Sequence, residues 1–334
     1  MRGFVFLSLL LIALLAANLM TGSVSIPPEQ VVSILMGETP QRAIWRYIVI
    51  DTRLTQAIVA LFSGASLAVS GLMLQTAFRN PLADPTIFGI SSGAGLGAAI
   101  VLLAFGGSVA AGSLSLSGFS AVLLAAFVGA MLVTAILFLF SNIVKSGVML
   151  LIIGIMIGYL ASSAVSLLNF FATEQGVKSY IVWGMGSFGG VPLTMLPAFV
   201  LVCTIGLFAA LLLIKPLNVL LLGKSYAENL GVNISRLRNA LLLITGLLTS
   251  VVTACCGPIS FIGLAVPHVA RLLFRSSDHK VLMPATMLCG SATALFCQML
   301  SLLPGTVIPL GIVTSIIGAP VVIYIIMRNR KAIT

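Results

Sequence analysis

The sequence predicts an all-α, polytopic membrane protein with about ten transmembrane helices in one bundle. Apolar residues make up 60% of the chain and charged residues only 7%, and the mean hydropathy is +1.21. So few polar side chains cannot cover the surface of a soluble globule. We therefore expect residues 1–334 to form one transmembrane domain.

Each span needs roughly 20 apolar residues to cross the hydrocarbon core of a bilayer. Charged and Pro/Gly-rich breaks divide the sequence into ten apolar segments, at 4–21, 54–78, 86–106, 117–140, 147–171, 193–214, 236–254, 258–274, 281–301 and 309–327. The first of these follows Arg2 and resembles a secretory signal, but it lacks a clean A-x-A cleavage site. We expect it to be an uncleaved first span.

The distribution of basic residues predicts that both termini are cytoplasmic. With the N-terminus inside, the 17 Lys and Arg divide into 13 inside and 4 outside, as expected because basic residues accumulate in cytoplasmic loops. The outside set is Arg42, Arg46, Arg53 and Lys178. A basic rim that faces anionic membrane lipid accounts for the net charge of +10 without any nucleic-acid partner.

The longest predicted outer segments are 22–53 and 172–192. The second contains TEQGVKSYIVWGMGSFGG, in which Tyr180 and Trp183 stand beside glycines. Aromatic side chains of this kind settle at membrane interfaces. We expect a short interfacial helix here, which serves either as an anchor or as a lid over a central pathway.

The sequence offers no pattern for a metal or cofactor site. The cysteines lack C-x-x-C spacing and read as small buried hydrophobes, and His268 and His279 read as packed or capping residues near span ends. The seven acids lie outside the middle of every predicted span: Glu29, Glu38, Asp51, Asp84, Glu174, Glu228 and Asp278. This absence argues against ion-coupled transport and against intramembrane hydrolysis, which need ionisable groups at membrane depth.

Two patterns describe how the spans are joined and packed. Small residues recur four apart at Gly93 and Gly97 and at Gly154 and Gly158, a spacing that lets helices approach closely in lipid. Between the second and third spans, a Pro-fixed turn holds Arg79, Asn80, Pro81, Asp84 and Pro85. The charge count places this turn on the cytoplasmic side.

The longest cytoplasmic loop is KPLNVLLLGKSYAENLGVNISRLR, residues 215–238. Its G-K-S resembles a phosphate-binding loop, but Asn218 stands where the first glycine is needed and no strand precedes it. We therefore predict no nucleotide site. The segment SYAENLGV, between predicted turns at Gly223 and Gly231, reads either as a docking helix for a cytoplasmic partner or as a solvated connector.

Four segments in order carry a family resemblance: RNPLADPTIFGISSGAG, GKSYAENLGVN, GPISFIGLAVPHVARLLFRSSDHK and PLGIVTSIIGAPVVIYII. Together they resemble the permease subunits of ABC importers for vitamin B12, haem and iron-siderophore complexes. The similarity extends over residues 22–330, nearly the whole chain.

That resemblance implies a multi-pass protein of the bacterial inner membrane which is not itself an enzyme. It implies a second permease subunit, expected to be identical, with the translocation path between the two. Two copies of a cytoplasmic ATPase and a periplasmic or lipid-anchored substrate-binding protein complete the importer. No cofactor is implied. The matching loop in the family is the coupling segment that seats in the ATPase, which here assigns that role to Gly223, Lys224, Ala227, Glu228 and Gly231.

The chain departs from the vitamin B12 permease pattern at three places, one of which is the stretch QMLSLLPGTVIP, where a later external arginine of that pattern is absent. Where that pattern has two arginines bracketing Leu-Pro, this chain reads RLTQ, so Arg53 matches and Gln56 does not. Docking of the binding protein is therefore assigned to Arg53, Arg46 and Lys178. The Thr-Ser pair of the cytoplasmic gate falls near Gly147, with Ser146 beside it.

The expected function is inward transport of a bulky metal chelate by alternating access. An iron-siderophore complex or haem is the leading cargo, and vitamin B12 is the alternative. The competing class is an ion-coupled secondary transporter, and a weaker one is a receptor or scaffold without transport.

Overall fold

The computed structural model describes residues 2–111, 114–144, 146–302 and 307–330. Within these ranges the chain is almost entirely helical, as predicted. The exception is a short antiparallel hairpin, β1 (Ser108–Ala111) and β2 (Leu114–Ser117), which the sequence did not predict. The helices are α1 (Arg2–Met20), α2 (Pro28–Leu35), α3 (Ala43–Arg46), η1 (Tyr47–Leu54), α4 (Thr55–Phe78), α5 (Ile90–Ala99), η2 (Ile100–Ala104), α6 (Phe119–Ile143), α7 (Gly147–Phe171), α8 (Glu174–Gly184), η3 (Phe188–Gly190), α9 (Leu196–Leu212), α10 (Ile214–Leu221), α11 (Lys224–Asn229), α12 (Ile234–Cys256), α13 (Ile262–Phe274), α14 (His279–Ser301) and α15 (Leu310–Arg330).

Every one of the ten predicted spans contains a helix of the structure. Among the described residues, six helices are long and apolar enough to cross a membrane, or seven if the bent pair α9 and α10 is one span. The remaining predicted spans correspond to three shorter apolar helices, Ile90–Ala104, Ile262–Phe274 and Leu310–Tyr324. The order of apolar segments is thus that of a polytopic helical bundle.

One predicted boundary was wrong, and a bend next to another span was not predicted. The second span does not begin at residue 54, because α3, η1 and α4 form one helix of 36 residues over Ala43–Phe78. The sixth span bends by 47° between α9 and α10. Pro216 lies in the first turn of α10, where a missing backbone N–H costs no helical hydrogen bond.

Helix α4 forms the centre of the molecule, and small residues allow its neighbours to approach. A Cβ atom on Gly64 would lie 2.2 Å from the carbonyl oxygen of Gly290 in α14, and one on Gly71 would lie 1.8 Å from that of Gly263 in α13. A Cβ on Gly97 of α5 would meet the backbone of α6 at 2.0 Å. The predicted close packing through small residues is therefore confirmed.

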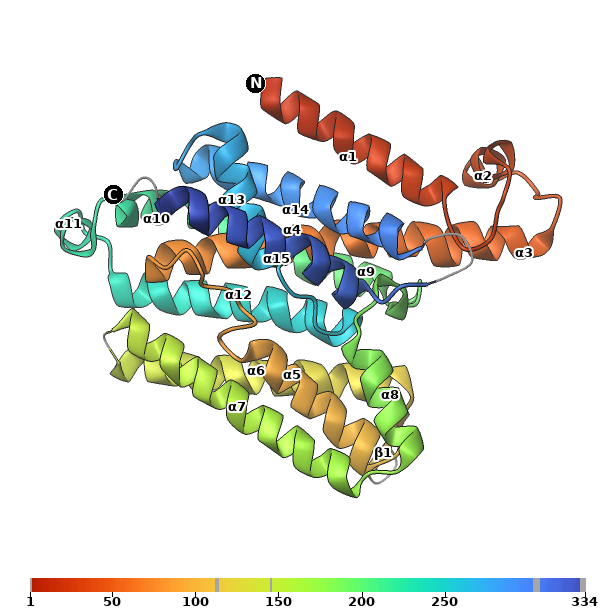
Figure 1. Cartoon of the computed structure of the whole chain (residues 1–334), viewed down its shortest axis with the longest axis horizontal. Coiled ribbons are helices and arrows are strands. Elements are labelled where there is room, and N and C mark those ends of the chain that lie inside the picture. The colour runs from red at the N-terminus through yellow and green to blue at the C-terminus, as the bar shows by residue number, and fades with distance from the viewer. Residues whose placement is uncertain (1, 112–113, 145, 303–306, 331–334) are drawn as a thin grey trace.

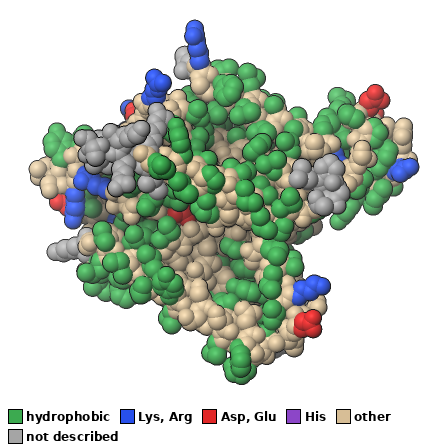
Figure 2. Space-filling model, viewed as in Figure 1, with side chains coloured by type: hydrophobic (Ala, Val, Ile, Leu, Met, Phe, Trp, Pro, Cys, Tyr) green, Lys and Arg blue, Asp and Glu red, His purple; other side chains and the backbone are tan. Residues whose placement is uncertain are grey.

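The long helices lie roughly along one direction and divide the molecule into two ends (Figure 1). Helix α11, the start of α1 and the end of α15 lie toward the left in this view, whereas α2, α3, α8 and β1 lie toward the right. Charged side chains gather near the rims, and the surface between them is largely apolar (Figure 2). We call the two ends the α11 end and the α8 end.

At the α8 end, backbone hydrogen bonds join three elements. The N–H of Ser187, just after α8, donates to the carbonyl oxygen of Cys256 at the end of α12 (2.8 Å). The N–H of Gly311 in α15 donates to the carbonyl oxygen of Met185 (2.9 Å), and that of Leu310 donates to Gly186 (3.3 Å). The segment predicted as an interfacial helix is therefore fastened to two long helices.

Candidate functional site

Helix α11 projects at one end of the bundle between two glycine turns. Gly223 precedes it with φ 122° and Gly231 follows it with φ 83°, conformations that favour glycine. The N–H of Val232 donates to the carbonyl oxygen of Ala227, and the N–H of Gly231 donates to that of Glu228, both at 3.0 Å. This is a Schellman closure, which satisfies the carbonyl groups of the last turn and ends the helix sharply.

Helix α11 presents apolar side chains outward. The α11 residue Ala227 faces inward and is fully buried, but the side chains of Leu222, Tyr226 and Leu230 are 64%, 54% and 56% exposed. Tyr226 and Leu230 are four apart and share one face of α11, whereas Leu222 lies before Gly223 at the end of α10. Glu228 is also exposed. An exposed apolar ridge flanked by charge is typical of a surface that another protein covers.

Arg79 connects the turn after α4 to the base of α11. It adopts a left-handed conformation (φ 47°, ψ 35°) as the residue that ends α4. Its Nη2 donates to the carbonyl oxygen of Leu220, at the end of α10, over 3.2 Å. The predicted cytoplasmic turn and the predicted coupling loop are therefore in contact.

The rest of this turn is fixed by the neighbouring helix α13. Asn80 Oδ1 accepts a hydrogen bond from the N–H of Leu82 (2.9 Å), and the carbonyl oxygen of Pro81 lies 2.9 Å from His268 Nε2. Pro85 is buried. His268 is thus a packing residue at this turn, as the sequence suggested.

Asp84 is the buried acid of the turn, with 3% of its surface exposed. Its Oδ1 accepts hydrogen bonds from the N–H and the hydroxyl of Thr86. A Cβ on Gly263 would lie 2.4 Å from its other oxygen. Burial raises the pKa of Asp84 above its usual value, and this effect exceeds the opposing effect of the Thr86 hydrogen bonds.

A second link, to α10 just before α11, was not predicted from the sequence. Asn218 of α10 accepts hydrogen bonds through Oδ1 from the backbone N–H and from Nδ1 of His279, both at 2.8 Å. On the other side of the ring, Nε2 lies 3.0 Å from Thr76 Oγ1 in α4. His279 therefore joins α10, α14 and α4. Only its position beside the N-capping residue Asp278 could have suggested such a role.

The structure also brings the predicted gate residues to this place. Ser146 is the N-cap of α7, where its Oγ accepts from the N–H of Met149 (3.4 Å). Ser146 and Gly147 line a cavity of about 270 Å³ together with Arg79 and Lys224. Three separate predictions, the turn, the coupling loop and the gate, thus lie around one cavity.

Of the predicted docking residues, Arg53 is placed differently from the other two. It is 4% exposed, and its guanidinium donates to the carbonyl oxygens of Leu19 (2.8 Å) and Met20 (3.0 Å). It thereby satisfies the carbonyl groups at the end of α1. This burial does not favour Arg53 as a docking residue. Arg46 and Lys178 are exposed and remain predictions.

No metal centre is formed by the part of the chain that the structure describes: it contains no group of three His, Cys, Asp or Glu residues that could hold an ion. Four of the cysteines are buried and one is partly buried, in line with their predicted role as small core residues.

With this geometry established, comparison with known proteins identifies the family. The model of the FecCD transport family matches residues 9–328, so the chain belongs to that family. Within it, the chain is 36% identical to the vitamin B12 import system permease protein BtuC of Klebsiella pneumoniae, over 97% of this chain and 93% of that protein. It is 34% identical to BtuC of Vibrio parahaemolyticus, over 99% and 95%.

Comparison with solved structures supports the same assignment. A transporter described as of the metal-chelate ABC type, in an inward-facing conformation, superimposes with a TM-score of 0.83 at 30% identity, covering 96% of this chain and 97% of that one. PsaBC from Streptococcus pneumoniae shares the fold alone, with a TM-score of 0.54 at 16% identity. The chain is therefore an ABC-importer permease, a multi-pass protein of the cytoplasmic membrane.

Proposed function

We propose that this permease carries a bulky metal chelate inward, powered by a separate ATPase that docks on α11. The observation that carries the proposal is the exposed apolar surface of Leu222, Tyr226 and Leu230 on and beside α11, next to the hydrogen bond that joins Leu220 to Arg79 at the end of α4. The residues Gly223, Lys224, Ala227, Glu228 and Gly231 form the docking element. Hydrolysis of ATP occurs in the partner, since this chain matches a permease family.

Force reaches the bundle from α11 by two routes. One is the hydrogen bond from Arg79 to Leu220, which joins the base of α11 to the end of α4. The other is His279, which connects Asn218 of α10 to Thr76 of α4. Both routes end on α4, the central helix, so a displacement of α11 moves the core rather than a peripheral loop.

The complete importer has two permease subunits, which we infer to be identical, and two ATPase subunits. The substrate path lies between the permeases, where α7 supplies a long apolar surface whose side chains are exposed in the single chain. A periplasmic or lipid-anchored binding protein delivers the cargo to the α8 end, and Arg46 and Lys178 are the basic residues assigned to its docking.

The substrate class is a metal chelate. The metal-chelate transporter and the vitamin B12 permeases named above support this class, since a corrinoid is itself a bulky cobalt chelate. Within the class we propose an iron-siderophore complex or haem, with vitamin B12 as the alternative. Growth of the parent strain and of a strain lacking the gene is compared with a ferric siderophore or haem as the sole iron source, and with vitamin B12 as the sole corrinoid source. The compound whose use is lost on deletion is the substrate.

Reconstitution tests the proposal directly. The permease and its candidate ATPase are placed together in lipid, and association, ATP turnover and chelate uptake are measured. We expect all three. Failure to associate, or uptake driven by a proton or sodium gradient without ATP, would overturn it.

Variants of α11 test its role. Glu228→Lys and Gly231→Trp should leave the protein folded but uncouple ATP hydrolysis from uptake. Because Gly231 has a positive φ, Gly231→Asn is the matched control: asparagine tolerates this conformation and adds little bulk. Glu29→Lys, an exposed acid of α2, controls for the charge change. Normal uptake in both α11 variants removes the coupling role.

A further inference from the structure

Two adjoining cavities beside α11 form one basic cleft. The larger, about 530 Å³, is lined by α11 and by the segment that leads into α12; the smaller, about 270 Å³, extends toward α4 and α7. Lys224, Ile234 and Arg238 line both. We name the two cavities together the basic cleft.

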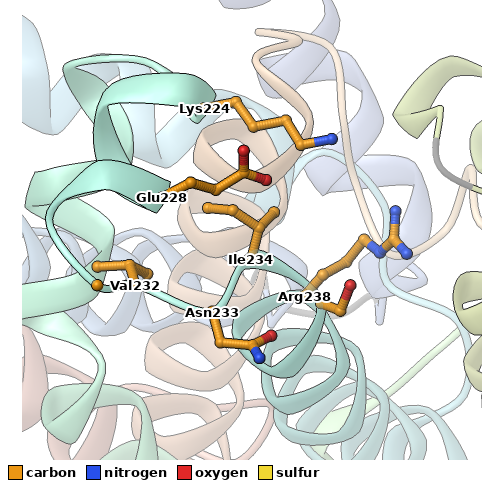
Figure 3. Close-up of a pocket in the computed structure, with 8 residues that line it drawn as sticks. Lys224, Glu228, Val232, Asn233, Ile234 and Arg238 are labelled. Carbon is orange, nitrogen blue, oxygen red and sulfur yellow. The ribbon is translucent and has the colours of Figure 1, made fainter.

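The charges around this cleft are unbalanced. Arg79, Lys224 and Arg238 line it, against a single acid, Glu228. The close-up shows the side chains of Lys224, Glu228 and Arg238 arranged around the larger cavity (Figure 3). Lys224 has no hydrogen-bond or ion-pair partner among the described residues. Three cations brought together with one carboxylate create a positive potential inside a concave site.

The cations approach the cleft from three different elements. Arg79 is held by its bond to Leu220, and Arg238 Nε is held by Ser141 Oγ at 2.8 Å. Two guanidinium groups are therefore positioned by the fold, and the flexible ammonium group of Lys224 completes the set. Such an arrangement matches the several oxygens of a phosphate group, which arginine and lysine bind by charge-assisted hydrogen bonds.

Hydroxyl and amide groups add to this set. Ser146 lines the smaller cavity, and Asn233 and Ser235 line the larger one. Ser146 and Asn233 are also the N-caps of α7 and α12, so the positive ends of two long helices face the same cleft. The helix ends supplement the three side-chain cations and would not define a site without them.

We propose that the basic cleft binds a phosphate group. Two sources share this chemistry: the headgroup of an anionic phospholipid, and a soluble phosphate. At the start of α7, the exposed apolar side chains of Val148, which lines the smaller cavity, and of its neighbour Met149, 66% and 54% accessible, offer contacts for a lipid chain. Binding to the cleft does not require an ATPase or a chelate, so it stands apart from the proposed function.

Binding is tested on the full-length permease alone, in nanodiscs. Inorganic phosphate is titrated by calorimetry in phosphatidylcholine nanodiscs, and lipids retained from mixed phosphatidylcholine and phosphatidylglycerol nanodiscs are identified by native mass spectrometry. Phosphate binding in the first arm identifies a soluble ligand. Retention of phosphatidylglycerol without phosphate binding identifies a headgroup.

The variants are Lys224→Gln and Arg79→Gln, with Lys280→Gln as the control. Lys280 is exposed and lines neither cavity. Loss of one charge-assisted hydrogen bond should weaken binding by about 10-fold or more, and the control should bind as wild type. Since Lys224 is exposed and unpartnered, its variant is expected to fold even if the Arg79 variant does not. Absence of both kinds of binding in the wild type, or equal weakening in the control, overturns the proposal.

Discussion

Arg79 has a strained backbone conformation from which its side chain reaches another helix. A non-glycine residue in the left-handed region is strained by about 1 kcal/mol, and Arg79 adopts it at the end of α4. Its guanidinium reaches Leu220 from there. The strain is local, and the bond connects two elements that the proposed function requires to move together.

Replacing Arg79 separates these two contributions. Arg79→Gly relieves the strain but removes the bond, so its melting temperature should stay near that of the wild type while uptake per ATP falls. Arg79→Ala loses the bond and keeps the strain, so it should be less stable than the glycine variant by about 1 kcal/mol. Equal uptake per ATP in the wild type and the glycine variant would contradict the assigned role.

The raised pKa of Asp84 predicts that the stability of the folded protein depends on pH. Burial raises its pKa in the folded protein above the ordinary value of 3.8, so the folded state binds this proton more tightly than the unfolded state. The resulting stabilisation is fully present below the unfolded pKa and is lost as the pH rises through the folded pKa. The melting temperature should therefore fall over that range.

The variant Asp84→Asn isolates this effect. Asparagine keeps an oxygen that accepts the Thr86 hydrogen bonds and has no proton to lose, so the decline with pH should become flatter. Glu29→Gln, an exposed acid at the α8 end, should keep the wild-type profile. An unchanged slope in the Asp84 variant would assign the decline to other groups.

At the scale of elements, α4 and α13 are held at a distance set by glycine. A methyl group at Gly71 would lie 1.8 Å from the carbonyl oxygen of Gly263, which is backbone and cannot turn aside. Gly71→Ala should therefore lower stability by about 1–3 kcal/mol and reduce the yield of folded protein. Gly184→Ala at the end of α8, where nothing lies within 4 Å, is the control and should leave both unchanged.

The order of the elements was predictable, but their contacts were not. Ten apolar runs separated by charged breaks indicate ten helical segments, because hydropathy is a local property. The bend between α9 and α10 was not predicted: the predicted span ended at residue 214, beside the break, and apolar composition carries no information about a change in helix direction. The burial of Arg53 was not predicted, because its charge is visible in the sequence, whereas the carbonyl groups it binds at the end of α1 are more than thirty residues away.

In the candidate site, the limits of α11 were predictable from the sequence, but the convergence of its residues on one cavity was not. The glycines at 223 and 231 predicted the limits of α11 from local turn chemistry, and the structure shows a helix between them. The convergence of Arg79, Ser146 and Lys224 on one cavity depends on how three helices pack. No spacing in the sequence encodes that distance.

For the whole molecule, the orientation of the bundle across the membrane can be tested. The count of 13 basic residues against 4 predicts that the α11 end is cytoplasmic. Ser225→Cys and Gln175→Cys place an exposed thiol at opposite ends. A membrane-impermeant maleimide applied to spheroplasts should label the second and spare the first, and permeabilisation should expose both. The reverse pattern would invert the topology and, with it, the assignment of the ATPase surface.

The joint at the α8 end has a consequence for how such a permease changes its cargo over evolution. It is built from main-chain hydrogen bonds between Met185, Gly186 and Ser187 on one side and Cys256, Leu310 and Gly311 on the other. The close approach of these main chains depends on glycine, since Gly186 has φ 73° and a Cβ on Gly311 would lie 2.8 Å from the carbonyl oxygen of Met185. Glycine at positions 186 and 311 therefore keeps α8, α12 and α15 mechanically connected, while other side chains on the nearby surface can change with the shape of the chelate.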